Sequence, residues 1–374
     1  MSATGASGGG SPARGGGAHE PGARANEART SHAPPSASRD LDPARELHAR
    51  HSAGLRVLAE RIGTAVRAHR DHALATGGAD GLMRIASQGA GDVTYGIDVP
   101  AEHALDVWLD EEARKAPLSL LTEDSGWRHR GPDGKGGVRA LDGFDHGGPR
   151  IVVDPIDGTR NLMTDLRPAW TVIGLAGPGA SEPRQKDVLL GVVREIPESR
   201  SSSTRELVAA RGQGCVLVDG ARERRLDTGS DARADHGYFP FFKYLPTERH
   251  EVAAVEARFF ERLARHEGAD VRNCYDDQYI SNAGQLVLLA LGTYRMIADL
   301  RAELARRRGG TTLTSKPYDV SGALVCAAEA GAIVTAWDGG ELDFPIDVVT
   351  PVSFVGWVNE ATRARLAPHL AAVL

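Results

Sequence analysis

The stretch IVVDPIDGTRN, residues 151–161, decides how the rest of this sequence is interpreted. It opens with three apolar β-branched residues, a pattern that predicts a buried strand. Asp154 and Asp157 follow three residues apart at the end of that strand, so both carboxylates can turn toward one point. Gly158 and Thr159 are expected to start a helix, which would place free backbone N–H groups beside the carboxylates. Because Mg²⁺ prefers one or two carboxylates together with phosphate oxygens, the stretch predicts a site for a divalent cation and a phosphate.

The same stretch also has a purely structural interpretation. Its Asp-Gly-Thr part fits an Asx-type turn with an aspartate that caps a helix. For a bare Asp-Gly pair we would favour that interpretation. The full string, placed directly after a buried strand, favours the cation and phosphate site instead.

Three other segments place acidic residues in a matching order along the chain. They are GDVTYGID at residues 91–98, LLTEDSG at residues 120–126 and KPYDVSGA at residues 316–323. Together with residues 154–161 they resemble the motifs of the inositol monophosphatase family, which also holds fructose-1,6-bisphosphatases and nucleotide 3′-phosphatases. The resemblance covers about residues 45–374. It implies an α/β (α+β) fold, the inositol-monophosphatase-like αβαβα layered sandwich.

The resemblance also implies a set of Mg²⁺ ligands. Glu123 and Asp154, with the backbone carbonyl of Ile156, would hold the first ion. Asp154, Asp157 and Asp319 would hold the second, so that Asp154 bridges the two. The chemistry agrees, because a phosphate monoester is a dianion whose hydrolysis needs charge neutralisation and an activated water. Two metal ions about 3.5–4 Å apart supply both.

Catalytic roles are implied for Asp98, Glu123 and Thr159. The Thr159 hydroxyl, hydrogen-bonded by Asp98, would orient the attacking water. The residues expected to contact the substrate lie beside the transferred phosphate and are Asp157, Gly158, Thr159 and Asp319. Taken alone, Asp98 and Asp319 are good helix caps. Their occurrence together with the other motifs favours the site.

The sequence departs from the family pattern where substrate specificity is expected. Tyr318 stands where the family usually has Trp. Family members that act on inositol phosphate carry a Glu shortly before this motif, which holds ring hydroxyls. Here the corresponding distance falls on Thr312, inside an apparent insertion over residues 301–315. Asp299 would replace that Glu if the insertion loops out.

The insertion is rich in cationic residues. Arg301, the run Arg306–Arg308 and the neighbouring Lys316 carry the charge. Such cations could bind a second phosphate or a sugar phosphate. The alternative is a solvated basic face, which is the commoner role of a charge run.

Hydrophobic periodicity predicts the secondary structure in outline. The expected helices span residues 41–75, 100–115, 251–266, 281–291, 320–330 and 359–374. The expected strands include residues 118–121, 151–153, 170–175, 188–193, 294–300, 332–335 and 352–357. The Gly- and charge-rich segment 128–150 has no period, which predicts a mobile surface loop.

Composition and the resemblance together give the domain boundaries. Gly, Ser, Ala, Pro and Arg fill the first residues, so we expect a disordered tail over residues 1–40. An N-terminal α+β domain with the metal and catalytic motifs would span residues 41–228. A C-terminal α/β domain over residues 229–374 would supply the last metal ligand.

The charge balance and the cysteines exclude several classes of protein. Forty-four Lys and Arg stand against 50 Asp and Glu, a net charge of −6, so a nucleic-acid partner is not expected. Three cysteines without metal or disulfide spacing predict reduced thiols. There is no apolar run of membrane-spanning length and no secretion signal, so we expect no membrane partner and a cytoplasmic location.

The expected function is that of a Mg²⁺-dependent, lithium-sensitive phosphomonoesterase. Its expected partner is a small phosphorylated metabolite, a polyol or sugar such as inositol-1-phosphate. The alternatives are a fructose-1,6-bisphosphatase, a nucleotide 3′-phosphatase and a catalytically silent protein that binds phosphorylated metabolites. Because the family is often dimeric, a homodimer is compatible with the resemblance.

Overall fold

The computed structural model describes residues 42–88 and 93–374. Residues 41–374 form one compact unit. The predicted tail over residues 1–40 lies outside the described residues. The division of the remaining chain at residue 228 stays a prediction.

The helices, in chain order, are α1 (Pro43–Ala75), α2 (Ala79–Leu82), α3 (Val99–Ala113), α4 (Thr159–Met163), α5 (Arg249–Glu267), α6 (Asn282–Ala290), α7 (Arg301–Arg307), α8 (Pro317–Glu329) and α9 (Glu360–Ala371). The predicted helices are present, and the short helices α2 and α7 were not predicted. None of the helices in the described ranges has an apolar stretch of the length that a bilayer requires.

One long sheet dominates the unit, with short strands elsewhere. In chain order the strands are β1 (Ile85–Gln88), β2 (Val93–Tyr95), β3 (Leu118–Thr122), β4 (Gly126–Pro132), β5 (Val138–Ala140), β6 (Arg150–Asp157), β7 (Ala169–Ala176), β8 (Val188–Ile196), β9 (Arg205–Ala210), β10 (Gly214–Asp219), β11 (Arg222–Arg225), β12 (Gly237–Tyr238), β13 (Cys274–Tyr275), β14 (Met296–Asp299), β15 (Ile333–Ala336) and β16 (Phe354–Trp357). Nine of them form a sheet in the order β11-β10-β9-β8-β7-β6-β3-β4-β5. A smaller sheet has the order β14-β16-β15.

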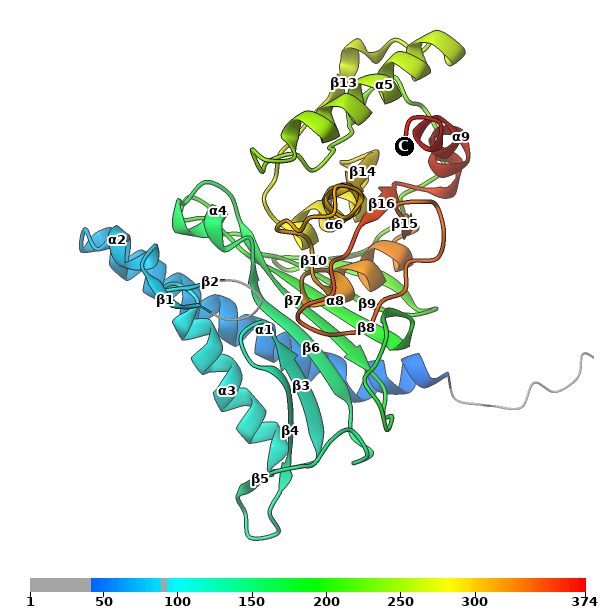
Figure 1. The fold of residues 1–374 in the computed structure, drawn as a ribbon. Helices are drawn as coiled ribbons and strands as arrows, with labels where there is room; N and C mark the ends of the chain where they lie inside the picture. Colours follow the sequence, from blue (N-terminus) through cyan, green and yellow to red (C-terminus); the bar gives the residue numbers. More distant parts are fainter. Residues whose placement is uncertain (1–41, 89–92) are drawn as a thin grey trace, which may run out of the picture. The chain divides into compact units, whose positions relative to one another are not determined.

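The two sheets and the helices stack in five layers (Figure 1). Helices α1 and α3 cover one face of the nine-stranded sheet, where one apolar cluster is buried. Helices α6 and α8 cover its other face and share a second cluster with the small sheet. Helices α5 and α9 close the far side of the small sheet over a third cluster. The αβαβα sandwich expected from the sequence is therefore confirmed.

Segment 128–150 is not the loop that the sequence predicts. Strand β4 pairs antiparallel with β3, and β5 pairs with β4 at the edge of the sheet. Most β4 side chains are only half-buried, so the strand lacks the apolar alternation that sequence patterns detect. The Ser119 hydroxyl of β3 lies 2.7 Å from a ring nitrogen of His129 and 2.7 Å from one of His146. These contacts join β4 and the loop around His146 to β3.

Helix α8 lies unusually close to the nine-stranded sheet. A Cβ on Gly322 would overlap the carbonyl oxygen of Ile173 in β7, and a Cβ on Gly191 in β8 would overlap the carbonyl oxygen of Gly322. The backbones of helix and sheet therefore meet without side chains between them. This contact fixes where the N-terminal end of α8 lies relative to the strands.

We expect Gly322→Ala to destabilise the protein by about 1–3 kcal/mol, because the added methyl group must push α8 away from β7. Urea unfolding midpoints measure the effect. Gly54→Ala in α1 is the matched control, since a Cβ there meets nothing within 4 Å. That control should stabilise the helix by about 0.5–1 kcal/mol. A Gly322→Ala protein that unfolds at the wild-type urea concentration would contradict the close contact.

Candidate active site

A β-bulge allows Asp154 and Asp157, which are three residues apart, to lie on the same face of the sheet. The predicted strand continues through both aspartates, as β6, instead of ending at Val153. Asp154 pairs with Val172 of β7 and Asp157 pairs with Trp170, so β6 has one extra residue between these pairs. Strict alternation would place the two carboxylates on opposite faces of the sheet. With the extra residue, both lie on the face that α6 and α8 cover.

Glu123 reaches the same place from the neighbouring strand. Strand β3 runs parallel to β6, and its last residue, Thr122, pairs with Val153. Glu123 directly follows β3 and therefore emerges beside Asp154. The parallel pairing brings the acidic motifs at residues 120–126 and 154–161 together, as the sequence predicts.

Asp319 arrives from the first turn of α8. The helix begins at Pro317, earlier than predicted, and its N-cap is Lys316. Asp319 is therefore not the N-cap itself, but it does cap the helix from the third helical position, as one half of a capping box with Lys316. Its Oδ2 atom accepts hydrogen bonds from the Lys316 backbone N–H and the Asn282 side-chain amide, both at 2.8 Å.

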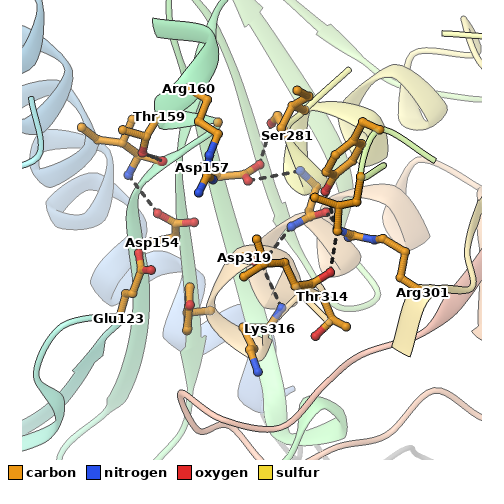
Figure 2. A pocket seen from close by; sticks show the side chains of 18 of the residues that line it. Glu123, Asp154, Asp157, Thr159, Arg160, Ser281, Arg301, Thr314, Lys316 and Asp319 are labelled. Carbon is orange, nitrogen blue, oxygen red and sulfur yellow. Dashed lines mark hydrogen bonds between the residues drawn. The ribbon is translucent and has the colours of Figure 1, made fainter. Parts of the chain in front are cut away.

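These side chains line a single cavity of about 380 Å³ (Figure 2). Of the residues predicted for the site, those that line it are Glu123, Asp154, Ile156, Asp157, Gly158, Thr159 and Asp319. Asp98 lines an adjoining small pocket together with Glu102 and Thr159. The fold thus brings together residues from four separate sequence motifs.

The carboxylates in the cavity repel one another. Burial raises the pKa of Asp154 well above its usual range, and three neighbouring carboxylates raise it further. They belong to Asp319, Asp157 and Glu123. Burial also raises the pKa of Asp319 to about 8 and that of Asp157 to about 6. Buried oxygen donors under mutual repulsion fit a divalent cation, whose charge would stabilise all of them.

The predicted ligand set itself stays a prediction. Within the described ranges, no three Asp, Glu, His or Cys side chains already surround one point as an ion would require. Asp157 instead accepts hydrogen bonds from the Ser281 hydroxyl at 2.6 Å and from the backbone N–H groups of Asn282 at 3.1 Å and Ala283 at 2.6 Å. The N-terminal end of α6 therefore holds this carboxylate, a role that sequence patterns alone do not indicate.

Thr159 follows a glycine that the local backbone requires. Gly158 has φ 95°, in the left-handed region, and is the N-cap of α4. Neither Asp154 nor Asp157 is therefore the cap of this helix. The Thr159 hydroxyl donates to the Ile156 carbonyl at 2.8 Å and lies 3.3 Å from Asp98 Oδ1. The predicted pairing of Thr159 with Asp98 is present, although Ile156 is the closer partner. Asp98 also accepts from the Tyr95 backbone N–H at 2.7 Å.

The structural interpretation of Asp154 is also partly correct. Its Oδ1 accepts a hydrogen bond from the Ile156 backbone N–H at 2.9 Å, which is the contact of an Asx turn. This contact uses one carboxylate oxygen. It holds the side chain in the cavity and does not exclude a role as ligand.

The insertion over residues 301–315 differs from the expectation in two respects. Asp299 is fully buried and pairs with Arg301, so it does not reach the cavity to hold ring hydroxyls. Thr312 does line the cavity. The side chains of Arg306 and Arg307 pair with Glu303, and that of Arg308 pairs with glutamates of the α5 region. The run Arg306–Arg308 is therefore an ion-paired face, whereas Arg301 and Lys316 line the cavity.

Comparison with known proteins places this geometry in a family. The family model described as the inositol monophosphatase family matches residues 101–371. The chain belongs to the inositol monophosphatase family. The predicted resemblance is thus confirmed, and by membership the chain is a phosphomonoesterase of the inositol monophosphatase family.

Individual members of the family show how far the similarity extends. The chain is 27% identical over 297 residues to the fructose-1,6-bisphosphatase/inositol-1-monophosphatase of Methanothermobacter thermautotrophicus, covering 78% of this chain and 89% of that protein. The extragenic suppressor protein of Bartonella henselae has the same fold, with a TM-score of 0.55 and 18% identity over 85% of this chain and 97% of that one. The inositol monophosphate-bound SaIMPase-II gives a TM-score of 0.53 and 17% identity over 87% and 98%.

Proposed function

We propose that this inositol monophosphatase family member is a Mg²⁺-dependent phosphomonoesterase that hydrolyses a small phosphorylated polyol or sugar. The observation that supports the proposal is the meeting of Glu123, Asp154, Thr159 and Asp319 in one cavity, from the end of β3 and from β6, α4 and α8. A phosphate placed there faces buried carboxylates on one side and the start of α4 on the other. Because the buried acids alone would repel the anion, a phosphate bound there needs cations between it and the carboxylates.

The carboxylates of Glu123, Asp154, Asp157 and Asp319, with the Ile156 carbonyl, would hold the cations. When bound, Mg²⁺ would neutralise the phosphate and lower the pKa of a water molecule. Asp157 would keep its hydrogen bonds to α6, which orient its carboxylate. The division of these oxygens between two ions follows the family resemblance.

The protein's own groups position the other reactants. The Thr159 hydroxyl would orient the attacking water through its Oγ1 atom, while Asp98 keeps that hydroxyl in place. The backbone N–H groups of Gly158 and Thr159, two residues that line the cavity, would hold the phosphate oxygens. Gly158 allows the start of α4 to lie close to Ser281, because a Cβ at position 158 would lie only 3.1 Å from Cβ of Ser281.

One feature of the cavity favours a second candidate, a fructose-1,6-bisphosphatase activity. The cavity wall includes Thr312, which stands where the resemblance would place the Glu of inositol-specific members, and the cationic residues Arg160 and Lys316. An anionic group at the far end of the substrate suits this wall better than ring hydroxyls alone. The bifunctional name of the Methanothermobacter relative points in the same direction.

Phosphate release across a panel of substrates tests the proposal. Inositol-1-phosphate, fructose-1,6-bisphosphate, fructose-1-phosphate and a nucleoside 3′-phosphate would each be incubated with the protein, with Mg²⁺ and again with EDTA. We expect release that requires Mg²⁺, with the bisphosphate turned over faster than the matched monophosphate. Binding of these compounds without release would support the silent binding protein instead. A preference for inositol-1-phosphate would reject the bisphosphatase candidate.

A further inference from the structure

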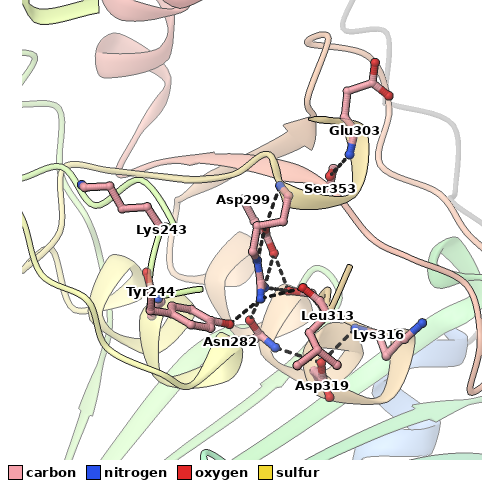
Figure 3. Close-up of polar contacts among 12 residues, drawn as sticks. Lys243, Tyr244, Asn282, Asp299, Glu303, Leu313, Lys316, Asp319 and Ser353 are labelled. Carbon is pink, nitrogen blue, oxygen red and sulfur yellow. Dashed lines mark hydrogen bonds and ion pairs between the residues drawn. The ribbon is translucent and has the colours of Figure 1, made fainter. Parts of the chain in front are cut away.

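The strongest unexplained feature beside the cavity is a buried guanidinium group. Arg301 begins α7, in the insertion, and only 2% of its side chain is exposed. It forms a two-point ion pair with Asp299, with its Nε 2.8 Å from Oδ1 and a terminal nitrogen 2.7 Å from Oδ2 (Figure 3). Burying such a pair is costly, and a structural role alone is often served equally well by apolar residues. The pair therefore calls for a specific function.

Arg301 connects its ion pair to the cavity through further hydrogen bonds. The same terminal nitrogen that meets Asp299 lies 3.3 Å from Oδ1 of Asn282. The other terminal nitrogen donates to the Tyr244 hydroxyl and the Leu313 carbonyl. Arg301 thus ties α6 to the segment that follows α7.

Asn282 carries the connection to Asp319. Its amide oxygen faces Arg301, and its amide nitrogen donates to Asp319 Oδ2 at 2.8 Å. A guanidinium group has donors only, so it decides which end of the amide points toward it. The opposite end, an N–H donor, must then point at the Asp319 carboxylate.

We propose that Arg301 is a positioning residue that sets the Asp319 carboxylate through the side-chain amide of Asn282. The proposal rests on the proposed function in one respect, that Asp319 is a cation ligand. Removing a group that hydrogen-bonds to a metal ligand and fixes its orientation typically lowers metal affinity 10–100-fold. A lysine would not substitute, because one ammonium group cannot present the planar fork that spans Asp299 and Asn282.

Binding of Mn²⁺ to the substrate-free protein, measured by titration calorimetry, tests the proposal without relying on turnover. Asn282→Ala removes the relay and leaves the Arg301–Asp299 pair intact. Arg301→Lys keeps the charge and removes the fork. We expect each variant to raise the dissociation constant of the second Mn²⁺ ion 10–100-fold. Arg306→Gln is the matched control on the same helix, because Arg306 is exposed and pairs only with Glu303 among its described contacts.

The double variant separates positioning from general damage to the fold. If Arg301 acts through Asn282, Arg301→Lys should have less than a twofold further effect in the Asn282→Ala background. Independent, multiplying effects, or wild-type Mn²⁺ binding by both single variants, would overturn the proposal. Should Arg301→Lys fail to fold, the charge-neutral combination Asp299→Asn with Arg301→Gln replaces it, with the same expected results.

Asp319→Asn distinguishes failure of this inference from failure of the proposed function. That variant should lose the second Mn²⁺ ion. If it binds Mn²⁺ like the wild type, the ligand assignment is wrong and the positioning role falls with it. If it loses the ion while Asn282→Ala and Arg301→Lys keep it, only the positioning role is wrong.

Discussion

Asp154→Asn is expected to abolish phosphate release while the protein stays folded. Asp154 is the proposed ligand of both cations, and each 1.36 kcal/mol of lost transition-state stabilisation lowers the rate tenfold. A loss of several kcal/mol of charge stabilisation gives a decrease of at least about 10³-fold. Without Mg²⁺ the melting temperature should be equal to or higher than that of the wild type. The substitution replaces a carboxyl group, whose ionisation is opposed by burial and by neighbouring carboxylates, with a neutral amide.

The measurement combines phosphate release with thermal unfolding in EDTA. Asp110→Asn, an exposed carboxylate on α3, is the control and should behave as the wild type in both. Near-wild-type activity of Asp154→Asn would show that the cation assignment is wrong. Unfolding of Asp154→Asn would instead show that the fold depends on the carboxyl group itself, since an asparagine Oδ1 can still accept the Ile156 N–H.

Thr159→Ala should lower kcat by roughly 10²–10⁴-fold, the range typical of lost proton-transfer assistance. Its hydroxyl bonds the Ile156 carbonyl and lies near Asp98, but it is not a proposed ligand. Affinity for Mn²⁺ should therefore change little. Steady-state kinetics at saturating Mg²⁺ and Mn²⁺ titration separate the two effects.

Two further variants sharpen the test. Thr159→Ser keeps the hydroxyl and should recover most of the activity. Thr164→Ala removes a hydroxyl at the other end of α4, which bonds the Arg160 carbonyl, and should leave kcat unchanged. Weaker metal binding with normal kcat in Thr159→Ala would assign the hydroxyl to the cation site instead.

The parts of the site that lie on one chain segment were predictable from the sequence. The strand and the start of α4 depend on nearby residues, namely the apolar run before Asp154 and the glycine at position 158. Both elements are confirmed. The β-bulge between Asp154 and Asp157 was not predictable, because it is defined by pairing with β7. Segment 128–150 was predicted wrongly since its strands sit at a sheet edge with little apolar alternation.

Contacts between distant segments account for what the sequence did not show. Ser281 and Asn282 were predicted only as the start of a buried helix, yet they hold Asp157 and Asp319. Asp299 is a carboxylate that was expected to reach the cavity if the insertion looped out. It is instead buried in an ion pair with Arg301. Spacing along a chain does not reveal which charge will neutralise another after folding.

The contact between Gly322 of α8 and β7 has a consequence for how this protein can diverge. A helix seated on a sheet through side chains moves whenever those side chains change size. Here backbone meets backbone where Gly322 lies against Gly174 and Gly191, so at this point no side chain separates α8 from the sheet. A change of side-chain size elsewhere in the core therefore reaches Asp319 less directly than it would if α8 rested on side chains alone.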